Sequence, residues 1–189
     1  MSSFFTRIFW SNEPFAKLPN SFFMPTTEGA IQWSCVPFRE LSVHTLYDAM
    51  QLRSQVFVVE QKCIWVEVDG YDKGCWHVIG TAPDGTIAAY ARLVAPLLKG
   101  PDQKRPIISR VVVPPEARGT GRGRVLMLKA MDECHKLWPT YGIEIGAQQR
   151  LEEFYASLGF KAVSEPYDED GILHVDMHHD YVKSTVTAL

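Results

Sequence analysis

The chain has 189 residues, a length typical of one domain that can bury a substantial core. Hydrophobic residues make up 46% and charged residues 22%, which excludes a disordered or coiled-coil chain. The formal net charge of −3 gives no basic field for nucleic acid or an anionic membrane, and no apolar run approaches the ~20 residues of a membrane span. We therefore expect no nucleic-acid partner, no membrane association and a cytoplasmic location.

Residues 1–30 differ in character from the rest of the chain. Aromatic residues are scattered among prolines without any period, and the continuous apolar stretch of a secretory signal is missing. We treat them as an N-terminal extension, with three interpretations open: an organelle-targeting segment, an arm that packs on the domain or a partner, or sequence upstream of the true start. The domain itself is expected over residues 31–182, followed by a tail over residues 183–189.

The first elements of the domain alternate between strand and helix patterns. Ile31–Phe38 predicts a strand, and Ser42 is a good N-cap for the helix that follows it. Residues 52–61 begin with a helical pattern and end in an apolar run with a polar pair. Residues 77–81 and 87–94 predict a hairpin, because Pro-Asp-Gly separates them.

A dense acidic segment holds Glu67, Asp69 and Asp72 within six residues. Three interpretations are open: a solvated turn, a cation site, or a structural ion-pair network with Arg53 and Arg110. A calcium loop is not indicated, because it needs further oxygen ligands at fixed positions.

The central stretch of the chain is a strand, a glycine-rich turn and a long helix. Ile107–Val113 is β-branched and mostly apolar, which suits a strand buried on both faces, and two prolines end it. Three glycines alternate with Thr120 and Arg122 before a helical pattern that runs to Trp138. Backbone N–H groups and the positive end of the helix dipole then point at one spot, which predicts an anion site, most naturally for a diphosphate.

Two other glycine-loop motifs fail on this stretch. A P-loop needs Lys and Ser or Thr after its last glycine, and Gly123 is followed by Arg124 and Val125. A dinucleotide fingerprint that starts from Gly119 and Gly121 would need glycine where Arg124 stands.

The last third of the domain continues the alternation. Residues 143–147 predict a strand, 151–158 a helix that Gly159 ends, and 161–165 and 173–178 the last two strands. The order is mixed α/β. The four cysteines show no C-x-x-C spacing and are expected to be reduced and mostly buried. Cys75-Trp76-His77 and His178-His179 lack further ligands at a standard spacing, so we expect no metal.

Several motifs together resemble a known enzyme family. Arg118-x-x-Gly121-x-Gly123 after a strand that ends in Val-x-Pro resembles the acetyl-CoA diphosphate loop of the GNAT N-acetyltransferases, and residues 154–160 resemble their F-Y-x-x-x-G-F helix. From about Ile31 to Asp180 the chain resembles the ElaA-like branch of that superfamily. The further motifs that carry this resemblance are Leu52-Arg53, residues 56–61, Glu67-Val68-Asp69-Gly70 with Asp72, His77, Ala91-Arg92, Gly146-Ala147-Gln148, and Glu169-Asp170-Gly171 with His174. The departures are Trp65 in place of tyrosine, Leu173 in place of proline, and the N-terminal extension.

This resemblance implies a fold and a reaction. The fold would be a central mixed, twisted sheet of about six to seven strands, flanked by helices and splayed at the central strand. The reaction would move an acetyl group from acetyl-CoA to a primary amine by direct attack, with Tyr155 as the general acid that protonates the departing thiolate. The residues that would bind CoA are Val111, Val112, Val113, Arg118, Gly119, Thr120, Gly121, Arg122 and Gly123.

The general base and the acceptor stay open at this point. Candidates for the base are Glu60, Asp69, Asp72 and His174, with Glu67 and His77 kept as the tentative catalytic choices, and water-mediated deprotonation is an alternative. The acidic group of residues 60–72 would favour a cationic acceptor if it rims the pocket. A polyamine, an amino acid, an aminoglycoside and a protein N-terminus all fit, and the resemblance makes a homodimer plausible. The alternative functions are a non-catalytic CoA-binding module and a nucleotide-dependent enzyme that uses the same loop.

Overall fold

The computed structural model describes residues 30–180. The expected extension up to residue 29 and the tail therefore lie outside the described residues. Within these limits the chain forms eight strands and three α-helices, linked by short 3-10 helices and one π-helix. The elements are β1 (Gln32–Pro37), η1 (Phe38–Glu40), α1 (Val43–Arg53), η2 (Ser54–Glu60), η3 (Asp72–Gly74), β2 (Trp76–Thr81), β3 (Ile87–Val94), β4 (Ile107–Val112), η4 (Pro115–Ala117), α2 (Arg122–Leu137), β5 (Ile143–Gln148), η5 (Gln149–Leu151), α3 (Glu152–Ala156), β6 (Lys161–Ala162), β7 (Tyr167–Glu169) and β8 (Ile172–His179).

All eight strands belong to one sheet, in the order β1-β2-β3-β4-β5-β8-β6, with β7 also paired to β8. Neighbours run antiparallel except β4 and β5, which run parallel. The mixed α/β fold is therefore confirmed. The sheet has one strand more than the upper expectation of seven, because the edge of β8 pairs with two short segments. Only Lys161–Ala162 of the strand expected over residues 161–165 pairs with β8, and Tyr167–Glu169 pairs with β8 further along.

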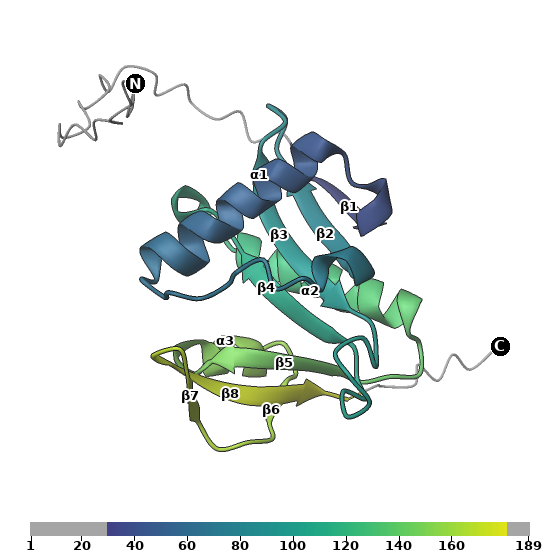
Figure 1. Cartoon of the computed structure of the whole chain (residues 1–189), viewed down its shortest axis with the longest axis vertical. Coiled ribbons are helices and arrows are strands. Elements are labelled where there is room, and N and C mark those ends of the chain that lie inside the picture. Colours follow the sequence, from purple (N-terminus) through teal and green to yellow (C-terminus); the bar gives the residue numbers. More distant parts are fainter. Residues whose placement is uncertain (1–29, 181–189) are drawn as a thin grey trace, which may run out of the picture.

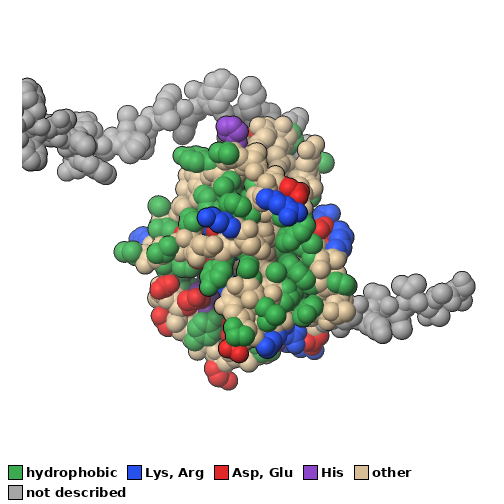
Figure 2. All heavy atoms as spheres, turned by 45° about the vertical axis from the view of Figure 1, so that its right-hand side comes forward, with side chains coloured by type: hydrophobic (Ala, Val, Ile, Leu, Met, Phe, Trp, Pro, Cys, Tyr) green, Lys and Arg blue, Asp and Glu red, His purple; other side chains and the backbone are tan. Residues whose placement is uncertain are grey.

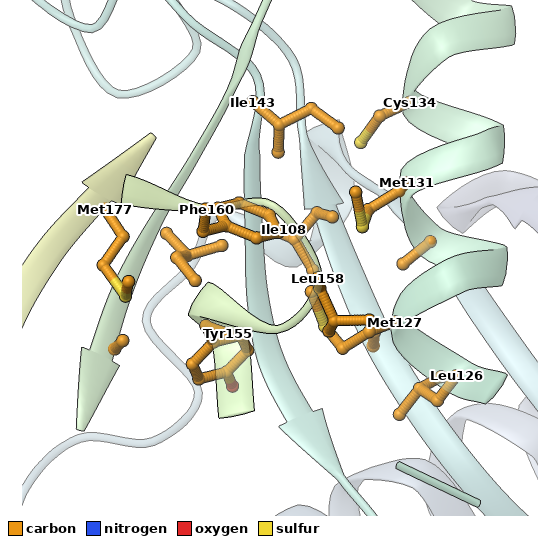
Figure 3. Close-up of a cluster of buried hydrophobic side chains, with 14 of the residues drawn as sticks. Ile108, Leu126, Met127, Met131, Cys134, Ile143, Tyr155, Leu158, Phe160 and Met177 are labelled. Carbon is orange, nitrogen blue, oxygen red and sulfur yellow. The ribbon is translucent and has the colours of Figure 1, made fainter. Parts of the chain in front are cut away.

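Helices cover both faces of the sheet. Figure 1 shows α1 in front of the half of the sheet that holds β2, β3 and β4, with α2 and α3 behind the sheet. The larger core lies on the side of α2 and α3, where Leu126, Met127 and Ile143 are fully buried (Figure 3). A smaller core lies under α1 and includes Leu52 and Tyr90.

Local signals explain where the first helix begins and continues. Ser42 accepts a hydrogen bond from the backbone N–H of Thr45 at 3.0 Å, which confirms it as the N-cap of α1. The segment after Arg53 continues as the π-helix η2, a rare form that is often found at functional sites. On the surface, Figure 2 shows acidic side chains in the lower part of the view, at the height that β7 and β8 occupy in Figure 1.

Candidate active site

Strand β4 carries a bulge that reverses the direction of its side chains. Arg92 pairs with Ser109, but Tyr90 pairs with Val112, so one extra residue lies on β4 between the two pairs. Arg110 adopts a left-handed backbone conformation there, with φ of 53°. Ile108 belongs to the core beside α2, whereas Val112 belongs to the core beside α1. An extra residue in a strand has this effect, because side chains alternate between the faces.

Beyond the start of β4, its other edge separates from β5. The register of this parallel pair contains only Ile107 and Glu144 within the described residues. The expected splay at the central strand is therefore confirmed. Because the strands part, backbone N–H and C=O groups of residues 109–112 on that edge are available to a ligand that lies between β4 and β5.

A cavity of about 490 Å³ opens at this splay. Its walls are β4, the segment from Val56 to Trp65, β5, and the β7–β8 hairpin. Two contacts join the walls across it: the Gln148 side-chain amide donates to Oε1 of Gln61 at 3.1 Å, and the Cys63 thiol donates to the carbonyl oxygen of Asp170 at 3.5 Å. Segments that are 87 and 107 residues apart in the sequence therefore enclose one cavity.

Tyr155 of α3 lies at this cavity. Its side chain is 8% exposed, packs edge-on against Phe154 and Phe160, and lines the cavity together with Val111 and Val113. Figure 3 shows its ring beside the apolar core. Burial raises the pKa of the Tyr155 hydroxyl to about 12, so the group stays protonated at neutral pH and can donate a proton.

The glycine turn leaves backbone exposed at the N-terminus of α2. Gly119 and Gly121 have φ of 76° and 81°, a left-handed conformation that glycine adopts without strain. Gly121 is the N-cap of α2 and provides no side-chain cap, so the first N–H groups of this helix are available to an anion. A Cβ added at Gly119, Gly121 or Gly123 would meet no atom within 4 Å, which leaves room for a diphosphate beside the backbone.

Arg118, at the start of this turn, is held by an ion pair. Its two terminal nitrogens donate to Oε1 and Oε2 of Glu60 at 2.7 and 2.8 Å. Both side chains are partly exposed and line the cavity. The pair joins the end of η2 to the turn that precedes α2.

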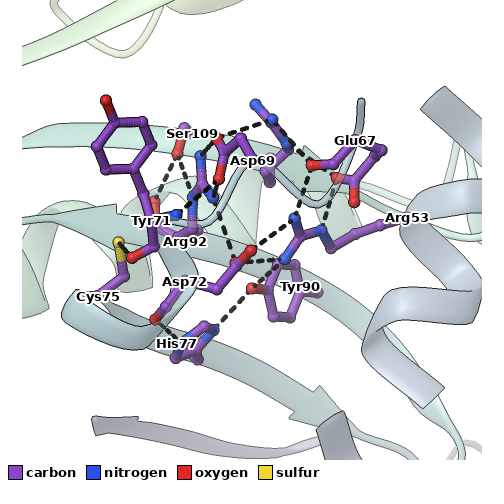
Figure 4. A network of polar contacts seen from close by, with 11 residues as sticks. Arg53, Glu67, Asp69, Tyr71, Asp72, Cys75, His77, Tyr90, Arg92 and Ser109 are labelled. Atoms are coloured by element: carbon purple, nitrogen blue, oxygen red, sulfur yellow. Dashed lines mark hydrogen bonds and ion pairs between the residues drawn. The ribbon is translucent and has the colours of Figure 1, made fainter. Parts of the chain in front are cut away.

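The acidic segment of residues 67–72 belongs to a buried ion network (Figure 4). Arg53 is fully buried and donates to Glu67 at 2.7 Å and to Asp72 at 2.6 Å. Arg92, also fully buried, donates to both carboxylate oxygens of Asp69 at 2.7 Å. Among the interpretations open from the sequence, the ion-pair network is the one that the structure shows.

Arg110 connects this network to the bulge on β4. Its guanidinium donates to Oε1 of Glu67 at 2.9 Å and to Oδ2 of Asp69 at 3.1 Å, and it lies 4.2 Å from the ring centre of Trp65. A carboxylate on each side and an aromatic face thereby fix the residue that carries the left-handed backbone.

The structure places His77 and Glu67, the tentative choices for the base, in the buried network and away from the cavity. His77 is fully buried, its Nδ1 contacts the Tyr90 hydroxyl at 2.7 Å, and its Nε2 contacts the Asp72 carbonyl oxygen at 3.2 Å. Burial lowers the pKa of His77. Oε1 of Glu67 accepts from both Arg53 and Arg110, and neither His77 nor Glu67 lines the cavity. Both side chains therefore have structural positions, because network partners hold them away from the cavity.

The remaining candidates divide in the same way. Asp69 and Asp72 lie in the buried network. Of the four acidic residues between positions 60 and 72, only Glu60 lines the cavity, so this segment does not provide the acidic rim that would favour a cationic acceptor. His174 does line the cavity. Four further carboxylates, which were not among the candidates for the base, also line the cavity: Glu144 and Asp176 on β5 and β8, and Glu169 and Asp170 in the β7–β8 hairpin. The signal for Glu144 and Asp176 was the alternation of β5 and β8, where Glu144, Gly146, His174 and Asp176 fall on one face.

Two further properties concern metals and membranes. Within residues 30–180, no group of three His, Cys, Asp or Glu side chains is arranged to hold a metal ion. In the same part of the chain, no helix combines the length and the apolar character that a membrane crossing requires. The four cysteines are free, and three of them are buried.

Comparisons with known proteins agree with this geometry. The family model of the acetyltransferase (GNAT) domain matches residues 77–181. The crystal structure of an acyl-CoA N-acyltransferase from Pseudomonas aeruginosa is similar with a TM-score of 0.74 at 38% identity, covering 79% of this chain and 99% of that chain. A UPF0039 protein of Synechocystis is 38% identical over 147 residues, which are 78% of this chain and 94% of that protein. The chain therefore belongs to the GNAT acetyltransferase family, whose members carry out acyl transfer from acyl-CoA.

Within that family the chain is ElaA-like. Protein ElaA of Escherichia coli is 40% identical over 157 residues, which are 82% of this chain and 99% of ElaA. The crystal structure of ElaA gives a TM-score of 0.73 and covers 80% of this chain and 100% of that chain.

Proposed function

We propose that the protein transfers an acetyl group from acetyl-CoA to a primary amine by direct attack of the amine on the thioester. The observation that carries this proposal is the position of Tyr155. Its buried hydroxyl lines the same cavity as Val111 and Val113, where β4 and β5 part. A proton donor can protonate the leaving thiolate, and an unpaired backbone N–H can stabilise the negative charge on the carbonyl oxygen, so both groups assist cleavage of a thioester.

The residues of β4 and the glycine turn fit acetyl-CoA. The backbone of Val111, Val112 and Val113 would pair with the amide groups of the pantetheine arm, since the edge of β4 toward β5 is not used by the sheet there. The backbone of residues 119–123 and the Arg118 and Arg122 side chains would hold the diphosphate at the N-terminus of α2. Acetyl-CoA would supply the activated acyl group.

The chemical step uses few groups of the protein. The amine nitrogen forms a bond to the thioester carbonyl carbon, and a backbone N–H beside the bulge at Arg110 stabilises the negative charge that develops on the oxygen. The carbon–sulfur bond then breaks, and the Tyr155 hydroxyl gives its proton to the departing thiolate. The proton lost by the amine returns to Tyr155 through solvent, so the step is balanced.

The test is an assay of thiol release from acetyl-CoA with and without a panel of primary amines, together with mass spectrometry of the products. We expect release that requires an amine and a product heavier by one acetyl group. CoA binding measured by calorimetry without release for any amine would favour the alternative, a CoA-binding module without catalysis. Absence of CoA binding would contradict the function assigned to the glycine turn.

A further inference from the structure

We propose that the face of β5 and β8 in the cavity is a subsite for a second positive charge on the acceptor, so that the substrate is a small amine with at least two ammonium groups. This inference rests on the proposed function, because it names the acceptor class for the same cavity. One amine would react near Tyr155 and Val111, and another ammonium group would bind to Asp176 and its neighbouring carboxylates.

The strand register places these carboxylates together. Gly146 pairs with Asp176, and Glu144 pairs with His178 on the same face of β5 and β8. Asp176 and Glu144 are thus diagonal neighbours across two antiparallel strands, a relation that separates side chains by about 7 Å. Gly146 has no side chain between them, and a Cβ there would lie 3.6 Å from the Tyr167 hydroxyl and 3.8 Å from Asp176 Oδ1, so the tyrosine and the aspartate lie close over this glycine.

The β7–β8 hairpin adds two more acidic groups to the wall of the cavity, Glu169 and Asp170. Four carboxylates therefore line the β5–β8 side. A row of like charges on neighbouring strands raises the local concentration of a cation with several charges.

The cations of the cavity lie elsewhere and are largely engaged. Arg110 and Arg118 belong to the β4 side and are bound to the carboxylates of Glu67 and Glu60. Lys99 has its ammonium 5.7 Å from the ring centre of Tyr71, and Arg150 donates twice to Oε1 of Gln148. Within the described part of the chain, no Lys or Arg forms an ion pair with any of the four carboxylates on the β5–β8 side.

Tyr167 fixes the orientation of the central carboxylate. Its hydroxyl donates to Asp176 Oδ1 at 2.8 Å, and its ring stacks on His174 at 6.2 Å between ring centres. The other oxygen of Asp176 remains for a ligand. The Tyr167 hydroxyl is a neutral donor, so its hydrogen bond does not cancel the negative charge of Asp176. A carboxylate that is paired with an arginine would bind an ammonium group only weakly.

The experiment compares acceptors that differ only in charge. The initial rates and KM of acetylation are measured for a linear triamine, an aminoglycoside, a monoamine of similar length and a free amino acid. We expect kcat/KM for an amine with several charges to exceed that for the monoamine by about tenfold or more, with the excess falling as salt is raised. The first two arms identify the source, linear or cyclic. Equal or better rates with the monoamine or the amino acid would overturn the proposal.

Variants test the subsite itself. In Asp176→Asn, which keeps the shape of the side chain, the ratio of kcat/KM for the triamine to kcat/KM for the monoamine should fall about tenfold. Glu165→Gln is the matched control, because Glu165 is exposed and does not line the cavity. A preference unchanged by Asp176→Asn would also overturn the proposal.

Calorimetry of the triamine with the CoA-loaded protein separates the two claims. Binding that Asp176→Asn weakens, in a protein that acetylates no amine, would support the subsite and contradict the proposed function. Acetylation of the monoamine, with no tighter binding of the triamine, would support the proposed function and contradict the subsite.

Discussion

Glu60 and Arg118, which are 58 residues apart, form a bidentate ion pair with nitrogen–oxygen distances of 2.7 and 2.8 Å. The pair links the end of the π-helix η2 to the turn that starts α2. The hydrogen bond from Arg118 lowers the pKa of Glu60. Under the proposed function, the diphosphate of acetyl-CoA therefore competes with the Glu60 carboxylate for this guanidinium.

Removal of the Glu60 charge should tighten CoA binding. In Glu60→Gln the diphosphate no longer competes with a carboxylate for Arg118, and we expect the Kd for CoA in calorimetry to fall by about two- to fivefold. Stability should change little, since exposed ion pairs contribute about 0–1 kcal/mol. Glu116→Gln is the control, because it makes the same charge change nearby without a hydrogen bond to Arg118. A weaker affinity in Glu60→Gln would mean that Glu60 positions the arginine for the ligand.

Alanine at Gly123 should separate stability from binding. Gly123 lies in the first turn of α2, and a Cβ there would meet no protein atom within 4 Å. Gly123→Ala should raise the free energy of unfolding by about 0.5–1 kcal/mol, because alanine favours helix. Its methyl group would occupy the space of the diphosphate, so the Kd for CoA should rise about tenfold.

The comparison for this variant is Gly121→Ala. Gly121 has φ of 81°, so this substitution should lower stability by about 1–2 kcal/mol through backbone strain. Urea unfolding and calorimetry provide the two measurements. Wild-type affinity in Gly123→Ala would place the diphosphate somewhere else.

The buried network should be essential for folding. Arg53→Met leaves Glu67 and Asp72 without the arginine that bonds them at 2.7 and 2.6 Å, and we expect a loss of about 3–5 kcal/mol in urea unfolding. Arg39→Met is the matched control: its pair with Glu40 is exposed and 3.6 Å long, so its loss should stay below about 1 kcal/mol. Similar losses in both variants would show that burial of the network does not determine how much it contributes to the free energy of unfolding.

Low pH should decrease the free energy of unfolding through the same network. Burial raises the pKa of Asp69, but hydrogen bonds and charge from Arg92 outweigh it and lower the pKa to about 2. The unfolded value is about 3.9, so this contribution to stability is present above that pH and is lost as pH falls toward 2. In urea midpoints measured from pH 5 to 2, Asp69→Asn should show a shallower decline than wild type, while the exposed Asp132→Asn should follow wild type. A parallel decline in Asp69→Asn would contradict this assignment.

Much of the fold was predictable because its signals are local. Ser42 caps α1, Pro83-Asp84-Gly85 lies in the β2–β3 turn, and two prolines follow β4, as the residue types indicate. The glycine turn was predictable for the same reason, since its backbone needs positive φ at Gly119 and Gly121. Membership of the family followed from these motifs in order.

The interior of the site was harder to predict because it depends on contacts between distant segments. The sequence does not show that the acidic segment folds inward onto Arg53, Arg92 and Arg110. This fold places Glu67 and His77 in the buried network and away from the cavity. The π-helix η2 has no distinct residue pattern, because only its hydrogen-bond spacing differs from that of an α-helix. The acidic face of β5 and β8 could not be predicted without the register of these two strands, which η5, α3, β6 and β7 separate in the sequence.

The most direct test of the account is the rate of amine-dependent thiol release in Tyr155→Phe beside wild type. Tyr155 is the buried hydroxyl at the cavity, and its pKa of about 12 keeps it protonated throughout the assay range. We predict that kcat falls about 10²–10⁴-fold, the usual contribution of a general acid, while the Kd for CoA and the urea midpoint stay close to wild type. Tyr141→Phe, a change at an exposed tyrosine that does not line the cavity, should leave all three values unchanged. Unchanged turnover in Tyr155→Phe would contradict the account.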